Sequence, residues 1–220
     1  MTVAIFKRMS MPLVVVMLAV LSGSLYKGSL PFGSVCFVVI FLALGFIRSR
    51  FEQTLGRSGE ASDTLESLLL LAVFLGMGPT TMLYIATPWF AFADYSLPIV
   101  ISVCAVLLGA FALFVFYRSH VDLGRQWSVS LAIQDKHELI DHGVYRHVRH
   151  PMYAALFLIV IAQAGLLANW FAGFAGLVAF ALLYLLRVKR EEALMAAQFG
   201  EAWHAYTART PRLVPAFWRR

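Results

Sequence analysis

The 220-residue sequence is poor in charged residues and in cysteine. Asp, Glu, Lys and Arg make up only 14% of it, against about 25% in an average soluble protein. Hydrophobic residues reach 60%, and the mean hydropathy of +0.76 excludes an ordinary soluble domain and indicates a polytopic membrane protein. The two cysteines, Cys36 and Cys104, lie in apolar stretches and form no disulfide or CxxC pattern.

Common cofactor and metal motifs are also missing. The net charge of +6 would suit nucleic acid, but the basic residues stand at the ends of apolar runs, so no nucleic-acid partner is expected. The sequence has no GxGxxG motif and therefore predicts no Rossmann domain. His137 and His142 are five positions apart rather than the four of HExxH, and no cysteine lies nearby, so no metal is expected.

Apolar stretches predict an all-α polytopic membrane protein with about six transmembrane helices. They cover residues 11–26, 31–47, 67–87, 97–117, 152–168 and 170–186. The first follows Lys7 and Arg8, as in a signal peptide, but further spans follow at once and favour a helix. Gly76, Gly78 and Pro79 predict a kink or a close helix contact in the third. The polar link at 48–67 is typical of a surface loop.

The last two apolar stretches predict a tight helical hairpin. Each is near the lower limit of about 17 residues for a spanning helix, which leaves open whether both cross the bilayer. Only Asn169 separates them, so the hairpin returns Arg187 to the side of the membrane where Pro151 begins. Beyond it, a C-terminal interfacial helix is expected at about 188–207, because apolar residues recur near the helical period, with Gly200 as a weak point.

The basic residues predict an orientation. With the N-terminus in the cytoplasm, every Lys and Arg except Lys27 falls in a cytoplasmic segment, as the positive-inside rule requires. This bias favours six spans and places both termini and two polar clusters, residues 137–153 and 187–192, on the cytoplasmic face. Aromatic residues between 89 and 95 are typical of an interfacial belt.

The two polar clusters carry the candidate chemistry. In the first, Arg149-His150-Pro151 stands where a loop becomes a helix, and the free N–H groups of a helix start can seat a carboxylate or phosphate. In the second, Arg187 and Glu191 are i, i+4 neighbours. An isolated pair of this kind is usually a snorkelling arginine with a surface ion pair. Close to another polar cluster at the edge of a membrane bundle, it indicates a site.

Three motifs occur in order along the second half of the chain. They are Gly-x-Tyr-x-x-x-Arg-His-Pro-x-Tyr at 143–153, Arg-x-x-x-Glu-Glu at 187–192 and Phe-Gly-x-x-Trp-x-x-Tyr at 199–206. With the hydrophobic hairpin between them, they resemble the isoprenylcysteine carboxyl methyltransferase family and the related phospholipid methyltransferases. The resemblance covers about residues 120–215. It divides the chain into N-terminal transmembrane helices at 1–117 and a catalytic methyltransferase region at 118–220.

The resemblance implies a membrane-embedded enzyme that uses S-adenosyl-L-methionine. It places the predicted catalytic role on Arg187, which would hold the methyl acceptor, and on Glu191 and Glu192, which it does not separate. Ile140 replaces the valine usual in the family. The cofactor contacts that it implies are His137, Leu139, Ile140, Tyr145, His150, Pro151, Met152, Tyr153 and Glu191.

Elementary chemistry fits these assignments. Glu191 can attract the sulfonium and ammonium groups of the cofactor, while helix-end N–H groups or His150 take its carboxylate. A carboxylate acceptor is ionised at pH 7 and needs only orientation, which the planar fork of Arg187 supplies. An amine acceptor must lose a proton, with help from a histidine or Tyr145. The preferred interpretation is methyl transfer to the carboxylate of an isoprenylcysteine-like lipophilic or lipidated substrate that enters from the bilayer, among membrane lipids.

Three alternatives stay open. A phospholipid methyltransferase would use an amine acceptor. An NADPH-dependent sterol-type reductase resembles the same Arg-His-Pro-x-Tyr pattern, although that superfamily usually has Asn where this chain has Met152. A non-catalytic membrane scaffold would tolerate loss of Arg187 and Glu191.

Overall fold

The computed structural model describes residues 16–26, 28, 30–51, 64–124 and 139–216. In these ranges the chain is helical apart from turns and one isolated β-bridge, between Asp94 and Asn169, so the predicted all-α class is confirmed there. Within these ranges, four helices are long and apolar enough to cross a membrane: Phe32–Phe51, Thr64–Ala86, Ile99–Leu123 and Trp170–Phe199. The two other apolar helices, Val16–Tyr26 and Pro151–Leu167, are shorter.

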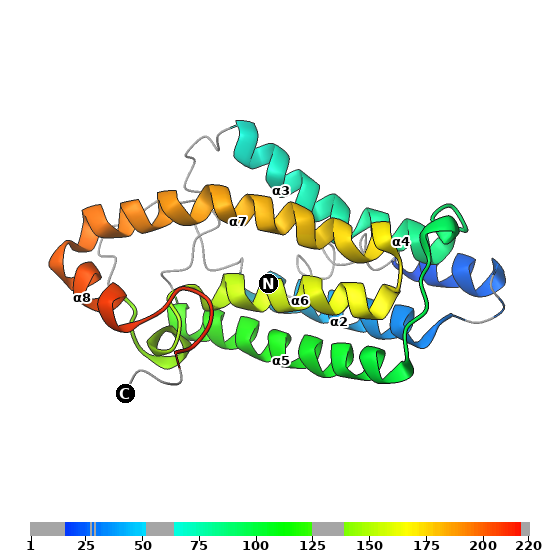
Figure 1. Ribbon diagram of the computed structural model, residues 1–220, viewed down its shortest axis with the longest axis horizontal. Helices are drawn as coiled ribbons and strands as arrows, with labels where there is room; N and C mark the ends of the chain where they lie inside the picture. The colour runs from blue at the N-terminus through cyan, green and yellow to red at the C-terminus, as the bar shows by residue number, and fades with distance from the viewer. Residues whose placement is uncertain (1–15, 27, 29, 52–63, 125–138, 217–220) are drawn as a thin grey trace.

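The long helices lie side by side along the longest axis of the molecule (Figure 1). Helix α6 packs against both α5 and α7, α3 packs against α7, and α2 packs against α5 and α6. The elements are α2 (Phe32–Phe51), α3 (Thr64–Met77), α4 (Pro79–Ala86), η2 (Ala91–Ala93), α5 (Ile99–Leu123), η4 (Gly143–Arg146), α6 (Pro151–Leu167), α7 (Trp170–Phe199) and α8 (Glu201–Arg209).

The third predicted span is broken at Gly78, between α3 and α4. Pro79 has no N–H to continue the helix, and the Thr81 hydroxyl donates to the carbonyl oxygens of Met77 (2.9 Å) and Gly78 (2.6 Å). Two residues before the break, a Cβ on Gly76 would lie 2.8 Å from the backbone of Ala175 on α7. Gly78 and Pro79 therefore form a kink, and Gly76 allows a close contact between α3 and α7, as the sequence predicted.

The C-terminal helix prediction was wrong about where the last membrane helix ends. α7 runs unbroken for 30 residues to Phe199, so residues 188–199 extend that helix instead of forming the start of a separate interfacial one. The sequence between Leu186 and Phe199 is rich in strong helix formers. Gly200 is the first residue beyond Trp170 with a positive φ, +51°, and it ends the helix before α8. As a result, Arg187, Glu191 and Glu192 all stand on one rigid helix.

The connection from α6 to α7 is only two residues long and is held by the segment around η2. Asn169 caps α7, since its side-chain oxygen accepts from the N–H groups of Phe171 and Ala172. Its amide nitrogen donates to Phe90 O and Asp94 Oδ1, both at 2.7 Å. Large exposed aromatic side chains surround this end of the helices, as expected for an interfacial belt: Trp89, Phe92, Trp170 and Phe171.

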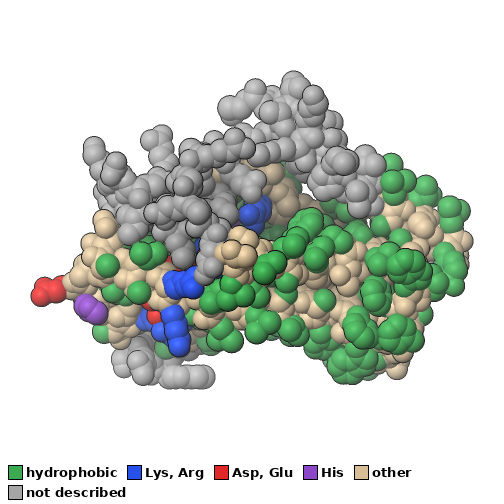
Figure 2. Space-filling model, turned by 90° about the horizontal axis from the view of Figure 1, so that it is seen from above, with side chains coloured by type: hydrophobic (Ala, Val, Ile, Leu, Met, Phe, Trp, Pro, Cys, Tyr) green, Lys and Arg blue, Asp and Glu red, His purple; other side chains and the backbone are tan. Residues whose placement is uncertain are grey.

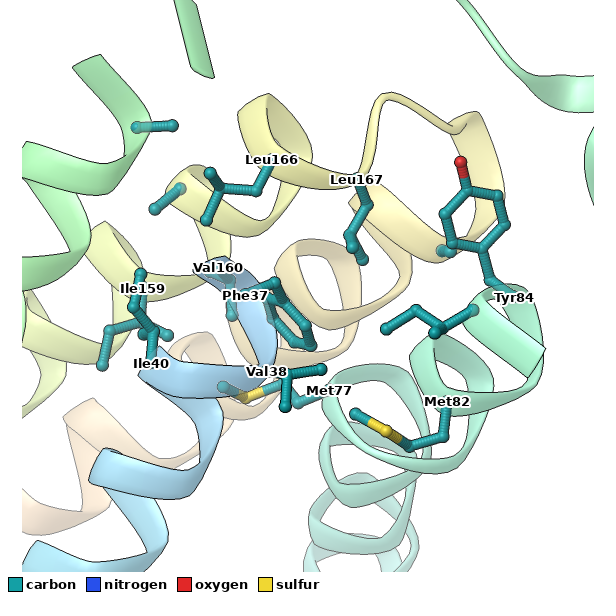
Figure 3. Close-up of a cluster of buried hydrophobic side chains, with 14 of the residues drawn as sticks. Phe37, Val38, Ile40, Met77, Met82, Tyr84, Ile159, Val160, Leu166 and Leu167 are labelled. Atoms are coloured by element: carbon teal, nitrogen blue, oxygen red, sulfur yellow. The ribbon is translucent and has the colours of Figure 1, made fainter. Parts of the chain in front are cut away.

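Apolar side chains from α2, α3, α4 and α6 meet in one buried cluster (Figure 3). Small residues let the helix backbones approach closely around it. A Cβ on Gly33 of α2 would lie 1.9 Å from the Leu166 carbonyl oxygen of α6, whereas a Cβ on Gly45 of the same helix would have no atom within 4 Å. Close packing through glycine is a common means of association between membrane helices.

These two glycines give a matched test of the packing. Gly33→Ala should force α2 away from α6 and lower the free energy of unfolding by about 1 to 3 kcal/mol. Gly45→Ala should be neutral, or stabilising by up to about 1 kcal/mol, because alanine is the better helix former. Melting temperatures of the two variants in detergent check this, and equal shifts would contradict the close α2–α6 contact.

On the visible face, the charged side chains of the described residues gather toward one end of the molecule, and hydrophobic side chains are most abundant toward the other end (Figure 2). The C-terminal ends of α5 and α7, the start of α6 and the whole of α8 lie at that end (Figure 1). The opposite end carries η2 and the connection from α6 to α7. The two polar clusters of the sequence are thus at the same end of the helices.

Candidate active site

The two polar clusters are joined by Tyr153 and Glu191. The Tyr153 hydroxyl, in the first turn of α6, donates to Glu191 Oε2 of α7 at 2.7 Å. His150 Nδ1, just before α6, lies 3.8 Å from Glu191 Oε1. Residues some 40 positions apart in the sequence therefore meet, because the α6–α7 connection folds α7 back along α6.

Glu192 forms a separate cluster with three cationic or polar side chains. Arg149 Nη2 lies 3.0 Å from its carboxylate and His150 Nε2 lies 3.2 Å from it. Arg212, beyond α8, donates to both carboxylate oxygens, and this hydrogen bonding raises the pKa of Arg212, which stays cationic. The Glu192 side chain is only 14% exposed, so a charge there requires such partners.

The same cluster holds the C-terminal segment against the start of α6. Arg149 Nη1 donates to the carbonyl oxygens of Thr207 (3.0 Å) and Thr210 (2.8 Å). The backbone N–H groups of Arg149 and His150 donate to Pro211 O and Arg212 O at 2.8 and 3.0 Å. These two N–H groups precede α6 and are used by a neighbouring loop, so they add nothing to the predicted anion seat at the first N–H groups of α6.

The structure thus distinguishes the two glutamates. Glu192 is committed to Arg149, His150 and Arg212, whereas the Glu191 side chain keeps 26% of its surface exposed and accepts from the Tyr153 phenol. The Tyr153 ring lies against the rings of His150 and Tyr184, with centroids 5.5 and 5.4 Å away. A partly exposed carboxylate near aromatic rings suits a cationic group, and the Tyr153 phenol bonds Glu191, the more exposed of the two glutamates.

Arg187 forms an ion pair with a residue that the sequence did not single out. Its Nε lies 3.3 Å from Glu66 Oε1, in the first turn of α3, and both side chains are 11% exposed. The segment around Glu66 was expected to be the end of a surface loop, and an acidic residue at a helix start is too common to stand out. Only the packing of α3 on α7 brings this carboxylate to Arg187.

Tyr145 is a buried anchor of the loop before α6. Its hydroxyl donates to Ser119 O at 3.4 Å, and its carbonyl oxygen accepts from the Tyr206 hydroxyl of α8 at 2.6 Å. Burial raises the pKa of the Tyr145 phenol far above its ordinary value. The phenol is therefore protonated at neutral pH and is not suited to act as a general base.

The other predicted cofactor residues lie near this loop. Pro151 is buried and Met152 half-buried in the first turn of α6, and Leu139 and Ile140 are half-buried where the described chain resumes. His137 lies outside the described residues. Among the described side chains, no three His, Cys, Asp or Glu residues gather as they would around a metal ion.

Comparison with known proteins finds a family that is similar to this region. A sequence profile described as the isoprenylcysteine carboxyl methyltransferase family matches residues 103–197. The resemblance inferred from the motifs is thus confirmed, and Tyr145, Tyr153, Arg187 and Glu191 all fall inside the family-matched region.

Curated relatives agree with this match. A protein-S-isoprenylcysteine O-methyltransferase of Schizosaccharomyces pombe is 28% identical over 112 residues, which are 49% of this chain and 48% of the relative. Protein-S-isoprenylcysteine O-methyltransferase B of Arabidopsis thaliana is 25% identical over 186 residues, 80% of this chain and 91% of the relative. A probable enzyme of the same name from Oryza sativa subsp. indica is 27% identical over 97 residues and matched over 51% of its length. The chain spans about half the length of the yeast and rice relatives.

Proposed function

We propose that the protein is an integral membrane methyltransferase that uses S-adenosyl-L-methionine and methylates the carboxylate of an isoprenylcysteine-like lipophilic or lipidated acceptor. The observation that carries this proposal is the arrangement in the family-matched region: Arg187 and Glu191 stand one turn apart on α7, and Tyr153 of the Arg-His-Pro-x-Tyr motif binds Glu191. The names of the curated relatives support the choice of acceptor.

The residues around Glu191 fit the cofactor chemically. The Glu191 carboxylate and the neighbouring rings of Tyr153 and Tyr184 suit a sulfonium or ammonium cation. We assign cofactor contacts to Glu191, to the segment of Pro151, Met152 and Tyr153, and to the preceding loop with Leu139, Ile140, Tyr145 and His150, with His137 as a further candidate. When bound, S-adenosyl-L-methionine supplies an activated methyl group. The protein has to hold the acceptor in line with it and exclude water.

Arg187 would orient the acceptor. Its planar guanidinium pairs well with a carboxylate, and its side chain is only 11% exposed, so water screens the pair weakly. A carboxylate acceptor is already ionised and needs no base. An amine acceptor would need one, and the raised pKa of Tyr145 removes that candidate. A histidine such as His150 would remain as a base for an amine, so the choice of a carboxylate acceptor rests on the names of the relatives.

The proposed topology follows the predicted one. The helices Val16–Tyr26 and Pro151–Leu167 join the four of spanning length, which gives six spans, with α6 and α7 as a tight hairpin. Both termini and the active site are proposed to be cytoplasmic, with transmembrane helices at 1–117 and the catalytic region at 118–220. The gathering of charge at one end of the molecule (Figure 2) supports this orientation.

A transfer assay with isotopically labelled methyl tests the proposal. Purified protein is given labelled S-adenosyl-L-methionine and, in parallel, a prenylcysteine, phosphatidylethanolamine, a fatty acid and a thiol. We expect label on the prenylcysteine, released by mild base as expected for a methyl ester. Calorimetry with S-adenosyl-L-methionine and with NADPH runs beside it. Binding of NADPH alone would favour the sterol-type reductase and reject the methyltransferase.

A further inference from the structure

Glu66 is a buried carboxylate at a place where a helix normally offers its side chains to water. It lies in the first turn of α3, where the helix dipole already favours a negative charge. Its side chain is nonetheless only 11% exposed and faces Arg187 of α7. Burial of a carboxylate is costly unless a cation accompanies it, so the pairing with Arg187 explains why Glu66 can be buried.

The surroundings place Glu66 within the candidate site. The Tyr153 phenol is within electrostatic range of Glu191, Arg187 and Glu66, and these four side chains come from three helices, α3, α6 and α7. Arg187 is paired with Glu66, and the Tyr153 phenol is bonded to Glu191 one turn further along α7. Glu66 alone among the four lies outside the family-matched region, residues 103–197.

We propose that Glu66 is a positioning residue for Arg187: its ion pair on the Nε side of the guanidinium keeps that group in one place, where it can face the acceptor carboxylate. The proposal rests on the proposed function, since it requires Arg187 to hold an acceptor. An arginine guanidinium has five N–H donors. Glu66 can therefore lie on the Nε side while the acceptor carboxylate binds the remaining N–H groups.

The fold explains how α3 can supply this contact. The close approach of Gly76 to Ala175 sets the distance between α3 and α7, and Glu66 lies about three turns before it on α3. The Nε–Oε1 distance of 3.3 Å is that of an ion pair, and within the described residues Nε does not form a hydrogen bond with this carboxylate. Such a contact can orient the guanidinium and still allow it to adjust when an acceptor binds.

A competing role makes the opposite kinetic prediction. If Glu66 occupied the place of the acceptor carboxylate, its removal would strengthen acceptor binding and lower KM. If it positions Arg187, its removal should lower kcat, because a misplaced group fails mainly in the transition state. A counter-ion with only a structural role would change neither constant and would change the melting temperature alone.

The test uses the full chain with labelled S-adenosyl-L-methionine and a prenylcysteine acceptor. Glu66→Gln, nearly identical in shape, should lower kcat by about 10- to 100-fold while the KM for the acceptor changes far less. Glu66→Asp, which keeps the charge, should recover part of kcat. The matched control is Glu201→Gln, which replaces an exposed glutamate in the first turn of α8 and should behave as wild type.

A double variant separates positioning from a general loss of stability. Lysine at 187 has no Nε edge, so Glu66→Gln added to Arg187→Lys should cost little further activity, and fully additive losses would overturn the proposal. It is also overturned if Glu66→Gln lowers the acceptor KM at unchanged kcat, or lowers only the melting temperature. These results would reject only the role of Glu66, because the wild-type protein would still transfer methyl groups. If the wild-type protein methylates none of the acceptors, the proposed function itself is rejected.

Discussion

Arg187→Ala is expected to lower kcat/KM for a carboxylate acceptor by roughly 100- to 1000-fold. Removal of one hydrogen-bond donor that faces a charged group in a water-excluded active site usually has an effect of this size. The guanidinium is nearly buried and stands one turn from Glu191. Without it, a bound carboxylate would be desolvated with no cation to face it. Steady-state kinetics with a prenylcysteine acceptor measure the loss.

The control for this variant lies on the same helix. Lys189→Ala removes an exposed lysine two positions further along α7 and should change kcat/KM by less than about 3-fold, as expected for an exposed surface charge. Arg187→Lys should fall between, because the ammonium keeps the charge but loses the planar fork. Full activity of Arg187→Ala would reject Arg187 as the acceptor-binding residue and favour a scaffold.

Glu192→Ala is expected to reduce stability more than any other single change at the site. It leaves Arg149, with a side chain 10% exposed, and His150, 4% exposed, without their shared carboxylate. Breaking a buried charge cluster in this way costs about 3 to 5 kcal/mol, which should lower the melting temperature by roughly 6 to 20 °C. Thermal unfolding in detergent measures it.

The neighbouring glutamate is the matched control. Glu191→Ala removes one hydrogen bond from Tyr153, worth about 1 kcal/mol, so the melting temperature should change little. S-adenosyl-L-methionine binding should instead weaken, by an amount that calorimetry reports. Equal thermal shifts in the two variants would contradict the different roles assigned to Glu191 and Glu192.

The contrast between these glutamates illustrates what a motif can and cannot predict. Adjacent residues on a helix point about 100° apart, so the pair Glu191-Glu192 had to face two different neighbours. Which neighbours these are depends on the C-terminal segment, since Arg212 reaches Glu192 only after α8 has turned the chain back. The sequence therefore predicted the cluster and left the two roles unassigned.

By itself, the sequence determined the features that depend on local composition and spacing. Long apolar runs are expected to form helices in a membrane, because an α-helix satisfies the hydrogen bonds of its backbone N–H and C=O groups within a single segment. Gly78-Pro79 broke a helix where those residues stand. The i, i+4 spacing of Arg187 and Glu191 put both on one side of α7.

Only the tertiary structure decided which charges meet. Glu66 reaches Arg187 because α3 packs on α7, and Arg149 reaches Glu192 because α6 begins beside the far half of α7. Helix α7 also ran past the apolar stretch to Gly200, since strong helix formers carried it beyond the predicted membrane boundary. Contacts of this kind join residues on separate helices, and their partners follow from how those helices pack rather than from any local pattern.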